Sequence, residues 1–175
     1  MGTHDDHGKS PASEHRAAGP ASVAIRVITV SDTRSLAEDK SGALLEEIFT
    51  AAGHRVTRAR VTDDAVKIRE AIADAENDPS VRAIVLTGGT GIAKRDVTAE
   101  LVASLLEKEL PGFGEIFRAL SFEEIGSAAI LSRAVAGIRG TRALFALPGS
   151  SAAVRLAATR LIVPELGHLV RELDK

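Results

Sequence analysis

Three short apolar segments recur along the chain, and each is followed by a stretch with helical periodicity or by a glycine-rich turn. The segments cover residues 23–30, 55–61 and 81–86, which are strand lengths, although the second is half polar. Residues 39–52 repeat large apolar side chains three and four positions apart, as one face of a helix requires. Strands that alternate with helices predict a mainly parallel sheet with helices on both faces, a three-layer α/β/α fold.

Turn residues and periodicity predict the remaining elements. Asp63 or Asp64 is expected to cap a helix that ends before Pro79. Arg139-Gly140 separates two strand-like segments and indicates a hairpin or two closely joined strands. The other predicted elements are helices over residues 97–109 and 113–126, strands over 130–138 and 141–147, and a helix that follows residue 151, restarts at Pro164 and ends near residue 173.

Composition narrows the class of protein. The 175 residues carry a net charge of −2 and only 3% aromatic residues, so neither a nucleic-acid footprint nor a stacking platform is expected. The absence of cysteine excludes disulfides and thiolate metal sites. No apolar run has the length of a membrane span and no signal-peptide core is present, so a cytoplasmic protein without membrane contact is predicted. His54 and His168 are predicted at the surface or an interface.

The first 21 residues differ from the rest of the chain. After Met1 they contain no aliphatic side chain larger than alanine, and they are rich in glycine, serine, histidine and charge. Such a segment cannot bury enough apolar surface to offset the entropy lost on ordering. Residues 1–21 are therefore predicted to form a disordered tail, and residues 22–175 a single domain.

Polar loops follow each predicted strand of the parallel sheet. Ligands of such sheets bind beyond the carboxyl ends of the strands, so these loops are expected to share one crevice. The four loops begin at Ser31, at Thr62, at Gly88 and at Pro148.

The third of these loops, residues 88–96, is named here the glycine loop. Gly88, Gly89 and Gly91 let the backbone approach a ligand closely, and their N–H groups, with the hydroxyls of Thr87 and Thr90, can bind an anion. Lys94 and Arg95 add positive charge. A plain strand-to-helix turn with solvated cations is the alternative. The spacing fits neither the dinucleotide fingerprint nor the phosphate-binding P-loop.

Two aspartates at these strand ends are candidate magnesium ligands. Asp63 follows the second strand and Asp96 closes the glycine loop. Mg²⁺ is usually held by one or two carboxylates together with substrate phosphates. Each aspartate could instead be only a helix N-cap.

The remaining candidates lie in the first and last loops and at the break between the helices predicted over residues 97–109 and 113–126. Asp39 could bind a ligand or cap the helix that follows it, and Ser150 could likewise be an ordinary N-cap. Glu115 could hydrogen-bond the amino edge of a heterocycle. The candidate substrate-binding residues are Ser31, Asp32, Asp39, Ser41, Gly42, Thr87, Gly88, Gly89, Thr90, Gly91, Lys94, Arg95, Glu115, Pro148, Gly149 and Ser150.

Several separated motifs resemble the molybdenum-cofactor biosynthesis family that includes MoaB and Mog. The motifs run in order from about Val23 to the end of the chain, and the final segment, LIVPELGHLVREL, is most similar to MoaB. The motifs are VSDTR, EDKSG, TGGTGIAKRDVTAE, PGFGEIFR, AILSRAVAGIRG and LFALPGS.

The resemblance implies a molybdopterin-binding domain over residues 22–175, commonly assembled as a homotrimer or a hexamer. It implies binding of molybdopterin and, in Mog-type members, transfer of an adenylyl group from Mg·ATP to the terminal phosphate of the pterin, with release of pyrophosphate. Asp63 and Asp96 match the acidic positions that the family uses around magnesium. Other proteins of the same biosynthesis are implied as partners. The alternative is a non-catalytic molybdopterin-binding protein or carrier of the same fold.

The chain departs from Mog-type enzymes in the last loop. Those enzymes usually read Pro-Gly-Gln-Pro, whereas this chain reads Pro148-Gly149-Ser150-Ser151. The fold and the class of ligand are therefore better supported by the resemblance than the catalytic step.

Overall fold

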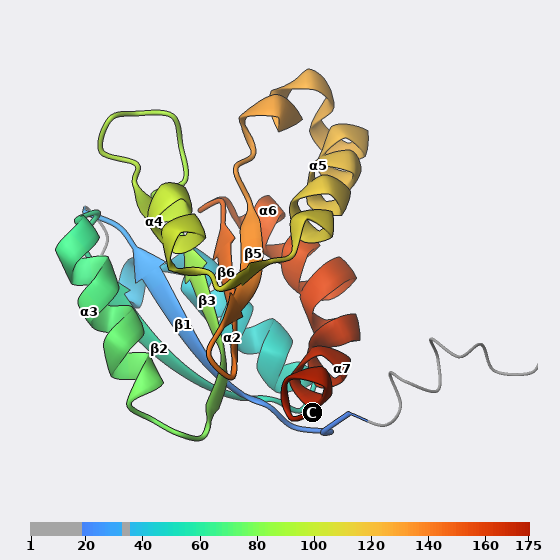
Figure 1. The fold of residues 1–175 in the computed structure, drawn as a ribbon. Helices are drawn as coiled ribbons and strands as arrows, with labels where there is room; N and C mark the ends of the chain where they lie inside the picture. Colours follow the sequence, from blue (N-terminus) through green and yellow to red (C-terminus); the bar gives the residue numbers. More distant parts are fainter. Residues whose placement is uncertain (1–18, 33–35) are drawn as a thin grey trace, which may run out of the picture.

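The computed structural model describes residues 19–32 and 36–175. One six-stranded sheet has the strand order β2-β1-β3-β6-β5-β4. Strands β2, β1, β3 and β6 are parallel, and β5 and β4 add an antiparallel edge. The prediction of a mainly parallel sheet in an α/β fold is confirmed (Figure 1).

The elements follow one another as strand-helix units in the first half of the chain. The strands are β1 (Ala24–Val30), β2 (Arg55–Val61), β3 (Val81–Thr87), β4 (Lys108–Glu109), β5 (Val135–Arg139) and β6 (Arg142–Leu147). The α-helices are α2 (Lys40–Ala51), α3 (Ala65–Glu76), α4 (Thr98–Leu105), α5 (Pro111–Ile125), α6 (Ser151–Ala157) and α7 (Val163–Leu173). Short 3₁₀ turns at Leu36–Glu38 (η1) and Gly126–Leu131 (η2), and a π-helical turn at Ala158–Ile162 (η3), join them.

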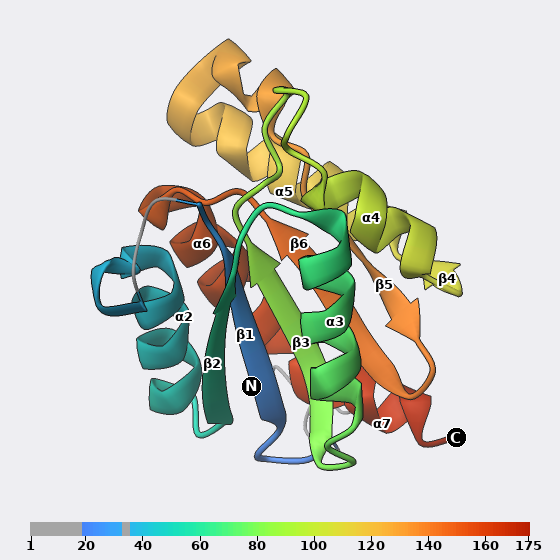
Figure 2. The same ribbon diagram turned by 90° about the vertical axis from the view of Figure 1, so that its left-hand side faces the viewer.

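Successive residues of the central strands pack on opposite faces of the sheet. Val27 and Val85 belong to the core beneath α2, α5, α6 and α7, whereas Ile28 and Ile84 belong to the core beneath α3 and α4. Figure 2 shows α3 and α4 lying across one face of the sheet. Both faces are buried, which is why these strands are almost uniformly apolar. No helix in the described part of the chain is long and apolar enough to cross a membrane.

Two predicted elements are shorter in the structure. The helix expected over residues 97–109 ends at Leu105, because Leu106 is extended and the backbone then pairs with β5 through Glu107 N–Ile138 O (2.8 Å) and Leu110 N–Ala136 O (2.8 Å). The strand expected from Ile130 begins at Val135, because η2 occupies the preceding residues. Tertiary pairing outweighs local helix propensity at the first of these places, whereas a local 3₁₀ helix replaces the expected strand at the second.

The start of the described chain packs against α7. A Cβ placed on Gly19 would lie 2.3 Å from the backbone of Gly167. Residues 1–18 of the predicted tail lie outside the described residues, so the disordered tail and the domain boundary at residue 22 remain predictions.

His54 is buried immediately before β2, so its prediction as a surface residue is wrong. Its side chain is 8% exposed, and the backbone N–H of Val23 donates to Nδ1 (3.2 Å). This hydrogen bond requires an unprotonated Nδ1. Burial lowers the pKa of His54 from its ordinary value, because the charged imidazolium loses hydration.

The stability of the protein should therefore fall as the pH falls through the His54 titration. The unfolded chain binds a proton near the ordinary histidine pKa of about 6.5 and the folded chain resists it, so stability rises with pH below neutrality. Chemical denaturation between pH 7.5 and pH 5 measures this loss. His54→Asn keeps an acceptor for Val23 N–H without a titrating group, so its stability should change less over the same interval. Equal pH dependence in the two proteins would contradict the assignment.

Candidate functional site

Three of the four polar loops line one small cavity at the carboxyl ends of the strands. The cavity has a volume of about 160 Å³ and is lined by Val30, Ser31, Asp32, Asp63, Gly89, Arg95 and Asp96. The fourth loop reaches the same place through the glycine loop, since Gly88 N donates to Leu147 O (3.1 Å) and Thr87 Oγ1 donates to Pro148 O (3.2 Å). The topology thus brings together segments far apart in sequence.

Asp63 is the most constrained carboxylate of the cavity. Its Oδ1 atom is buried and has no hydrogen-bond partner within the described residues. Burial is the largest cause that raises the pKa of Asp63, and the charges of Asp96 and Asp32 raise it further. A hydrogen bond from the backbone of Val97 and the charge of Arg95 oppose this rise. The charged form of Asp63 is destabilised by the fold.

Neither Asp63 nor Asp96 acts as the N-cap of the helix that follows it. Asp64 caps α3, accepting from Val66 N (2.9 Å) and Lys67 N (3.0 Å), and the N-cap of α4 is Val97, without a side-chain bond. Asp96 instead accepts from Ala93 N (2.9 Å) within the glycine loop.

Asp32 belongs to the same cavity and orients Asp63. Its Oδ1 accepts from the backbone N–H of Asp63 (2.9 Å), which joins the first loop to the second. No group of three or more histidine, aspartate or glutamate side chains in the described residues has the arrangement of a metal cage. A cation here would need ligands beyond the carboxylates.

The glycine loop leaves backbone donors free. Gly88 and Gly89 have φ values of 98° and 62°, which disfavour any residue with a Cβ. A Cβ on Gly89 would also lie 2.8 Å from Asp63 Oδ1. The N–H groups of Gly89, Thr90 and Gly91 make no hydrogen bond within the described residues. Such a row of free N–H groups is what an anion nest requires.

Some side chains of the glycine loop and of the start of α4 are exposed, and others are buried. Lys94 and Arg95 are exposed, and Arg95 lines the cavity. Thr90 is buried at 4% exposure. Thr98, which starts α4, is fully buried, and its hydroxyl has no partner within the described residues.

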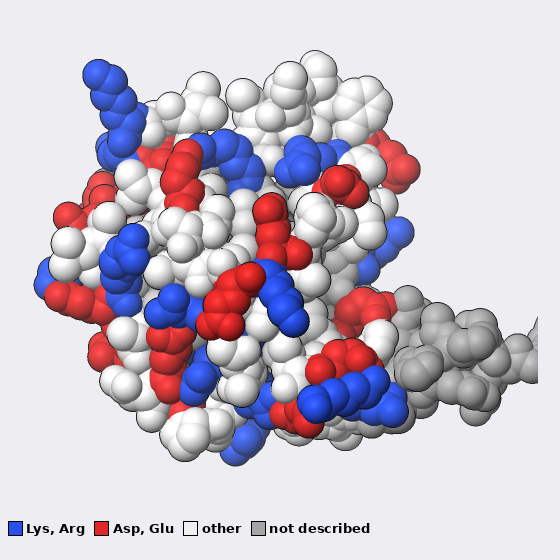
Figure 3. Space-filling model, in the orientation of Figure 1, with Lys and Arg blue, Asp and Glu red and all other residues white. Residues whose placement is uncertain are grey.

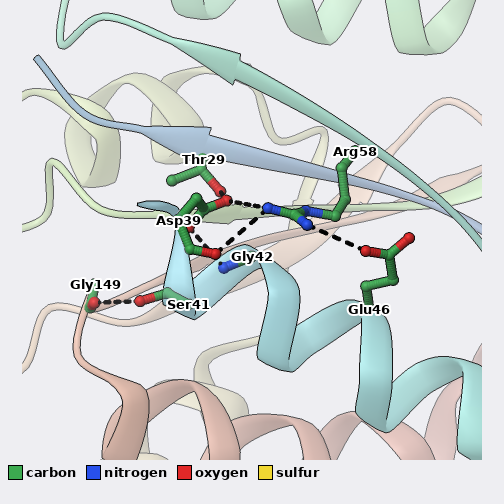
Figure 4. Close-up of polar contacts among 7 residues, drawn as sticks. All are labelled: Thr29, Asp39, Ser41, Gly42, Glu46, Arg58 and Gly149. Atoms are coloured by element: carbon green, nitrogen blue, oxygen red, sulfur yellow. Dashed lines mark hydrogen bonds and ion pairs between the residues drawn. The ribbon is translucent and has the colours of Figure 1, made fainter. Parts of the chain in front are cut away.

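Asp39 is a buried junction between the first loop and the sheet (Figure 4). Its side chain is 1% exposed; Oδ1 accepts from Gly42 N (2.8 Å), and Oδ2 accepts from Thr29 Oγ1 (2.6 Å) and Arg58 Nη2 (2.9 Å). Arg58 also pairs with Glu46 (3.2 Å). Asp39 therefore caps α2, as one of the sequence interpretations predicted, and both of its carboxylate oxygens accept from protein donors.

The next residues of the motif tie α2 to the last loop. Ser41 Oγ donates to Gly149 O (2.7 Å), as Figure 4 shows. A Cβ on Gly42 would lie 2.1 Å from Asp39 Oδ2, so only glycine fits beside the buried carboxylate. Ser150 caps α6 by accepting from Ala153 N (3.2 Å). Direct ligand contact by these residues remains a prediction.

Glu115 lies away from the aspartates, in a second cavity. This cavity, of about 480 Å³, lies between α4, α5 and β5. Its charged lining residues are Glu100, Glu109, Glu115, Arg118 and Arg133.

The sequence interpretation missed three residues that build the site. Arg58 neutralises Asp39, and Arg133 donates to the glycine loop. The Thr98 hydroxyl lies beside Gly89, as Asp63 Oδ1 does. Thr98 and Arg133 had sequence cues, since Thr98 lies in the motif TGGTGIAKRDVTAE and Arg133 lies in the motif AILSRAVAGIRG. Arg58 lies in none of the family motifs, and its role follows from the fold.

A doubly wound sheet with free loop N–H groups and carboxylates at its strand ends defines a ligand-binding α/β protein. The sequence model of a protein family described as a probable molybdopterin binding domain matches residues 26–168 of this chain. Molybdenum cofactor biosynthesis protein B of Halalkalibacterium halodurans is 52% identical over 164 residues, which cover 93% of this chain and 96% of the relative.

Solved structures agree with this match. A crystal structure of molybdenum cofactor biosynthesis protein B has a TM-score of 0.86 and 50% identity, covering 89% of this chain and 98% of that one. The tungsten cofactor synthesizing protein MoaB from Pyrococcus furiosus has a TM-score of 0.80 and 40% identity, covering 89% and 99%. The chain belongs to the molybdopterin-binding domain family of molybdenum cofactor biosynthesis proteins, as its motifs predicted.

Removing the partner of Asp39 should destabilise the protein strongly. Arg58→Met leaves a buried carboxylate without its cation, which costs about 3 kcal/mol of unfolding free energy. The double variant Asp39→Asn with Arg58→Met should be more stable than Arg58→Met alone, because no buried charge is left unpaired. Urea denaturation measures both.

Arg60→Met is the matched control for this pair. Arg60 lies on the same strand and donates to the Ser31 carbonyl (2.8 Å) rather than to a carboxylate. Its variant should lose clearly less stability. A loss as large as that of Arg58→Met would assign the effect to the arginine stem instead of the ion pair.

Proposed function

We propose that the protein acts in molybdenum cofactor biosynthesis by binding molybdopterin and adenylylating its terminal phosphate with Mg·ATP. The observation that carries this proposal is the cavity in which Asp63 and Asp96, neither of them a helix N-cap, lie beside Arg95 and the free N–H groups of the glycine loop. Family membership supplies the pterin as the ligand. The candidate residues of the first and last loops would bind the substrates. These residues are Ser31, Asp32, Asp39, Ser41, Gly42, Pro148, Gly149 and Ser150.

The reaction needs alignment more than proton transfer. A terminal phosphate oxygen of molybdopterin attacks the α-phosphorus of ATP, a new P–O bond forms, and the bond between the α-phosphorus and the bridging oxygen breaks to release pyrophosphate. Lys94 and Arg95 would offset the charge of the phosphates, and the backbone N–H groups of Gly89 to Gly91 would hold them in place. No side-chain nucleophile is required.

The residues of the cavity fit a magnesium ion. The buried, unpartnered Oδ1 of Asp63 is a hard oxygen donor of the type that Mg²⁺ selects, and Asp96 supplies a second carboxylate. These two residues would hold the ion together with nucleotide phosphates. The bound ion would neutralise negative charge that accumulates on the phosphates.

A non-catalytic molybdopterin-binding protein is the second candidate. The last loop favours it, since Pro148-Gly149-Ser150-Ser151 differs from the Pro-Gly-Gln-Pro of Mog-type enzymes. The two functions differ in nucleotide binding, because a pterin carrier has no use for Mg·ATP. Incubation with molybdopterin and Mg·ATP, followed by detection of adenylylated pterin and pyrophosphate, tests the enzyme. Pterin binding without either product would establish the carrier.

Asp63→Asn and Asp96→Asn should each lower adenylyl transfer by about a hundred- to thousandfold, as expected when one electrostatic stabiliser is lost. Asp63→Asn should at the same time raise the unfolding free energy at pH 7. The raised pKa of Asp63 means that its charge opposes folding, and asparagine can still accept the Val97 hydrogen bond. Asp96→Asn should change stability by about 1 kcal/mol or less.

Asp64→Asn is the matched control, because it changes the neighbouring charge at a true N-cap, where asparagine serves about as well as aspartate. It should keep the parental rate and stability. Near-parental transfer by the Asp63 and Asp96 variants would exclude them as magnesium ligands.

The proposed assembly is a homotrimer or hexamer. An apolar groove of about 340 Å³ lies between the start of α5 and α7, and Ile116 at its edge is 52% exposed. Figure 3 shows largely uncharged surface over the end of α5 and η2, where Phe122, Ile130 and Leu131 are more than half exposed. Exposed apolar patches of this kind mark contact surfaces.

Multi-angle light scattering at micromolar concentration should give the mass of three or six chains. Ile116→Asp should lower that mass if the groove is a contact between copies, because a charge cannot be buried there unpaired. A monomeric parent protein would contradict the proposed assembly.

A further inference from the structure

Arg133 lies between η2 and β5, and its side chain donates hydrogen bonds to several backbone carbonyls of the glycine loop. Nε donates to Thr90 O (2.9 Å), and Nη2 donates to Asp96 O (3.2 Å) and to Gly91 O. These carbonyls come from both ends of residues 90–96. One planar guanidinium therefore closes a loop that has little regular structure of its own.

The geometry of the peptide bond gives these contacts a consequence for the opposite edge of the loop. All peptide bonds of the described chain are trans, so the C=O of one residue and the N–H of the next point in opposite directions. With Thr90 O and Gly91 O held by Arg133, the N–H groups of Gly91 and Ile92 are directed away from the guanidinium. Neither N–H makes a hydrogen bond within the described residues.

Glu100 holds the guanidinium from the other side. Nη1 of Arg133 pairs with Glu100 Oε1, and this bond lowers the pKa of Glu100 from its ordinary value. Arg133 is 29% exposed, whereas Glu100 on α4 is 62% exposed. The arginine is thus fixed between α4 and the loop that precedes α4.

We propose that Arg133 is a positioning residue that presets the glycine loop for phosphate binding. By fixing three carbonyls it fixes the direction of the loop N–H groups and keeps Asp96 beside the cavity, so the entropy of ordering the loop is lost during folding and not during binding. The proposal rests on the proposed function only for the identity of the ligand, Mg·ATP.

The test compares Arg133→Lys with Arg118→Lys in the full chain. Lysine keeps the charge but loses the planar fork, so it cannot hold three carbonyls together. Arg118 and Arg133 both line the cavity of about 480 Å³ between α4, α5 and β5. Arg118 makes no hydrogen bond or ion pair within the described residues, which makes it the matched control. Hydrogen–deuterium exchange of the ligand-free proteins follows the amides of residues 88–96.

Arg133→Lys should increase amide exchange in this segment and weaken Mg·ATP binding by calorimetry, each by about tenfold, as expected for the loss of charge-assisted hydrogen bonds. Saturating Mg·ATP should return the exchange toward the parental level, with a raised KM and a nearly unchanged kcat. Arg118→Lys should resemble the parent in every readout. Glu100→Gln, a milder change, should increase exchange by less than Arg133→Lys.

A folded Arg133→Lys protein with parental exchange in residues 88–96 would overturn the proposal, as would a loss of stability that leaves Mg·ATP binding unchanged. If Arg133→Lys does not fold, parental exchange in Glu100→Gln would overturn it. If the parent does not bind Mg·ATP, the proposed adenylyl transfer fails, while the exchange of the ligand-free variants still decides the role of Arg133.

Discussion

The buried ion pair between Asp39 and Arg58 is the interaction on which the arrangement of the site depends. It joins the N-terminus of α2 to β1 through Thr29 and to β2 through Arg58. A carboxylate at 1% exposure is costly unless it is neutralised and hydrogen-bonded, and here Arg58 neutralises the charge and both oxygens accept hydrogen bonds. Because Ser41 lies two residues further on and binds Gly149 O, the same junction also fixes the last loop. The rigid part of the crevice is built around this buried charge, which the protein itself neutralises.

The cavity beyond this junction has the opposite character. Asp63 has a raised pKa, a buried oxygen without a partner and two carboxylate neighbours, so the fold opposes the ionised state of this residue. Groups that a fold destabilises in this way are concentrated at functional sites, where a ligand supplies the missing partner. Asp39 has protein donors on both of its oxygens, whereas Asp63 has a buried oxygen for which the proposed ligand would supply the partner.

The alternation of apolar segments with helical periodicity predicted the layers of the fold, because strands buried on both faces consist almost entirely of aliphatic residues. It could not decide between Asp63 and Asp64 as the cap of α3, since one residue of register separates a capping oxygen from one that faces the cavity. Nor could it pair Arg58 with Asp39 or Arg133 with Thr90, because those contacts join residues 19 and 43 positions apart through the sheet and the loops. The predicted end of the helix over residues 97–109 was wrong for the same reason, because local propensity does not reveal that Lys108 and Glu109 pair with β5.

The mixed charges around the glycine loop constrain the ligand. A bare phosphate would meet Asp32, Asp63 and Asp96 within one cavity, and like charges at such distances repel even when water screens them. A bare cation would meet Arg95 in that cavity and Lys94 beside it. A phosphate that carries its own divalent cation would satisfy both sets, because the carboxylates would hold the cation while the arginine and the free N–H groups would hold the phosphate oxygens. This complementarity supports Mg·ATP more strongly than an uncomplexed pterin phosphate, and it is why the charge pattern favours the proposed adenylyltransferase over the proposed carrier.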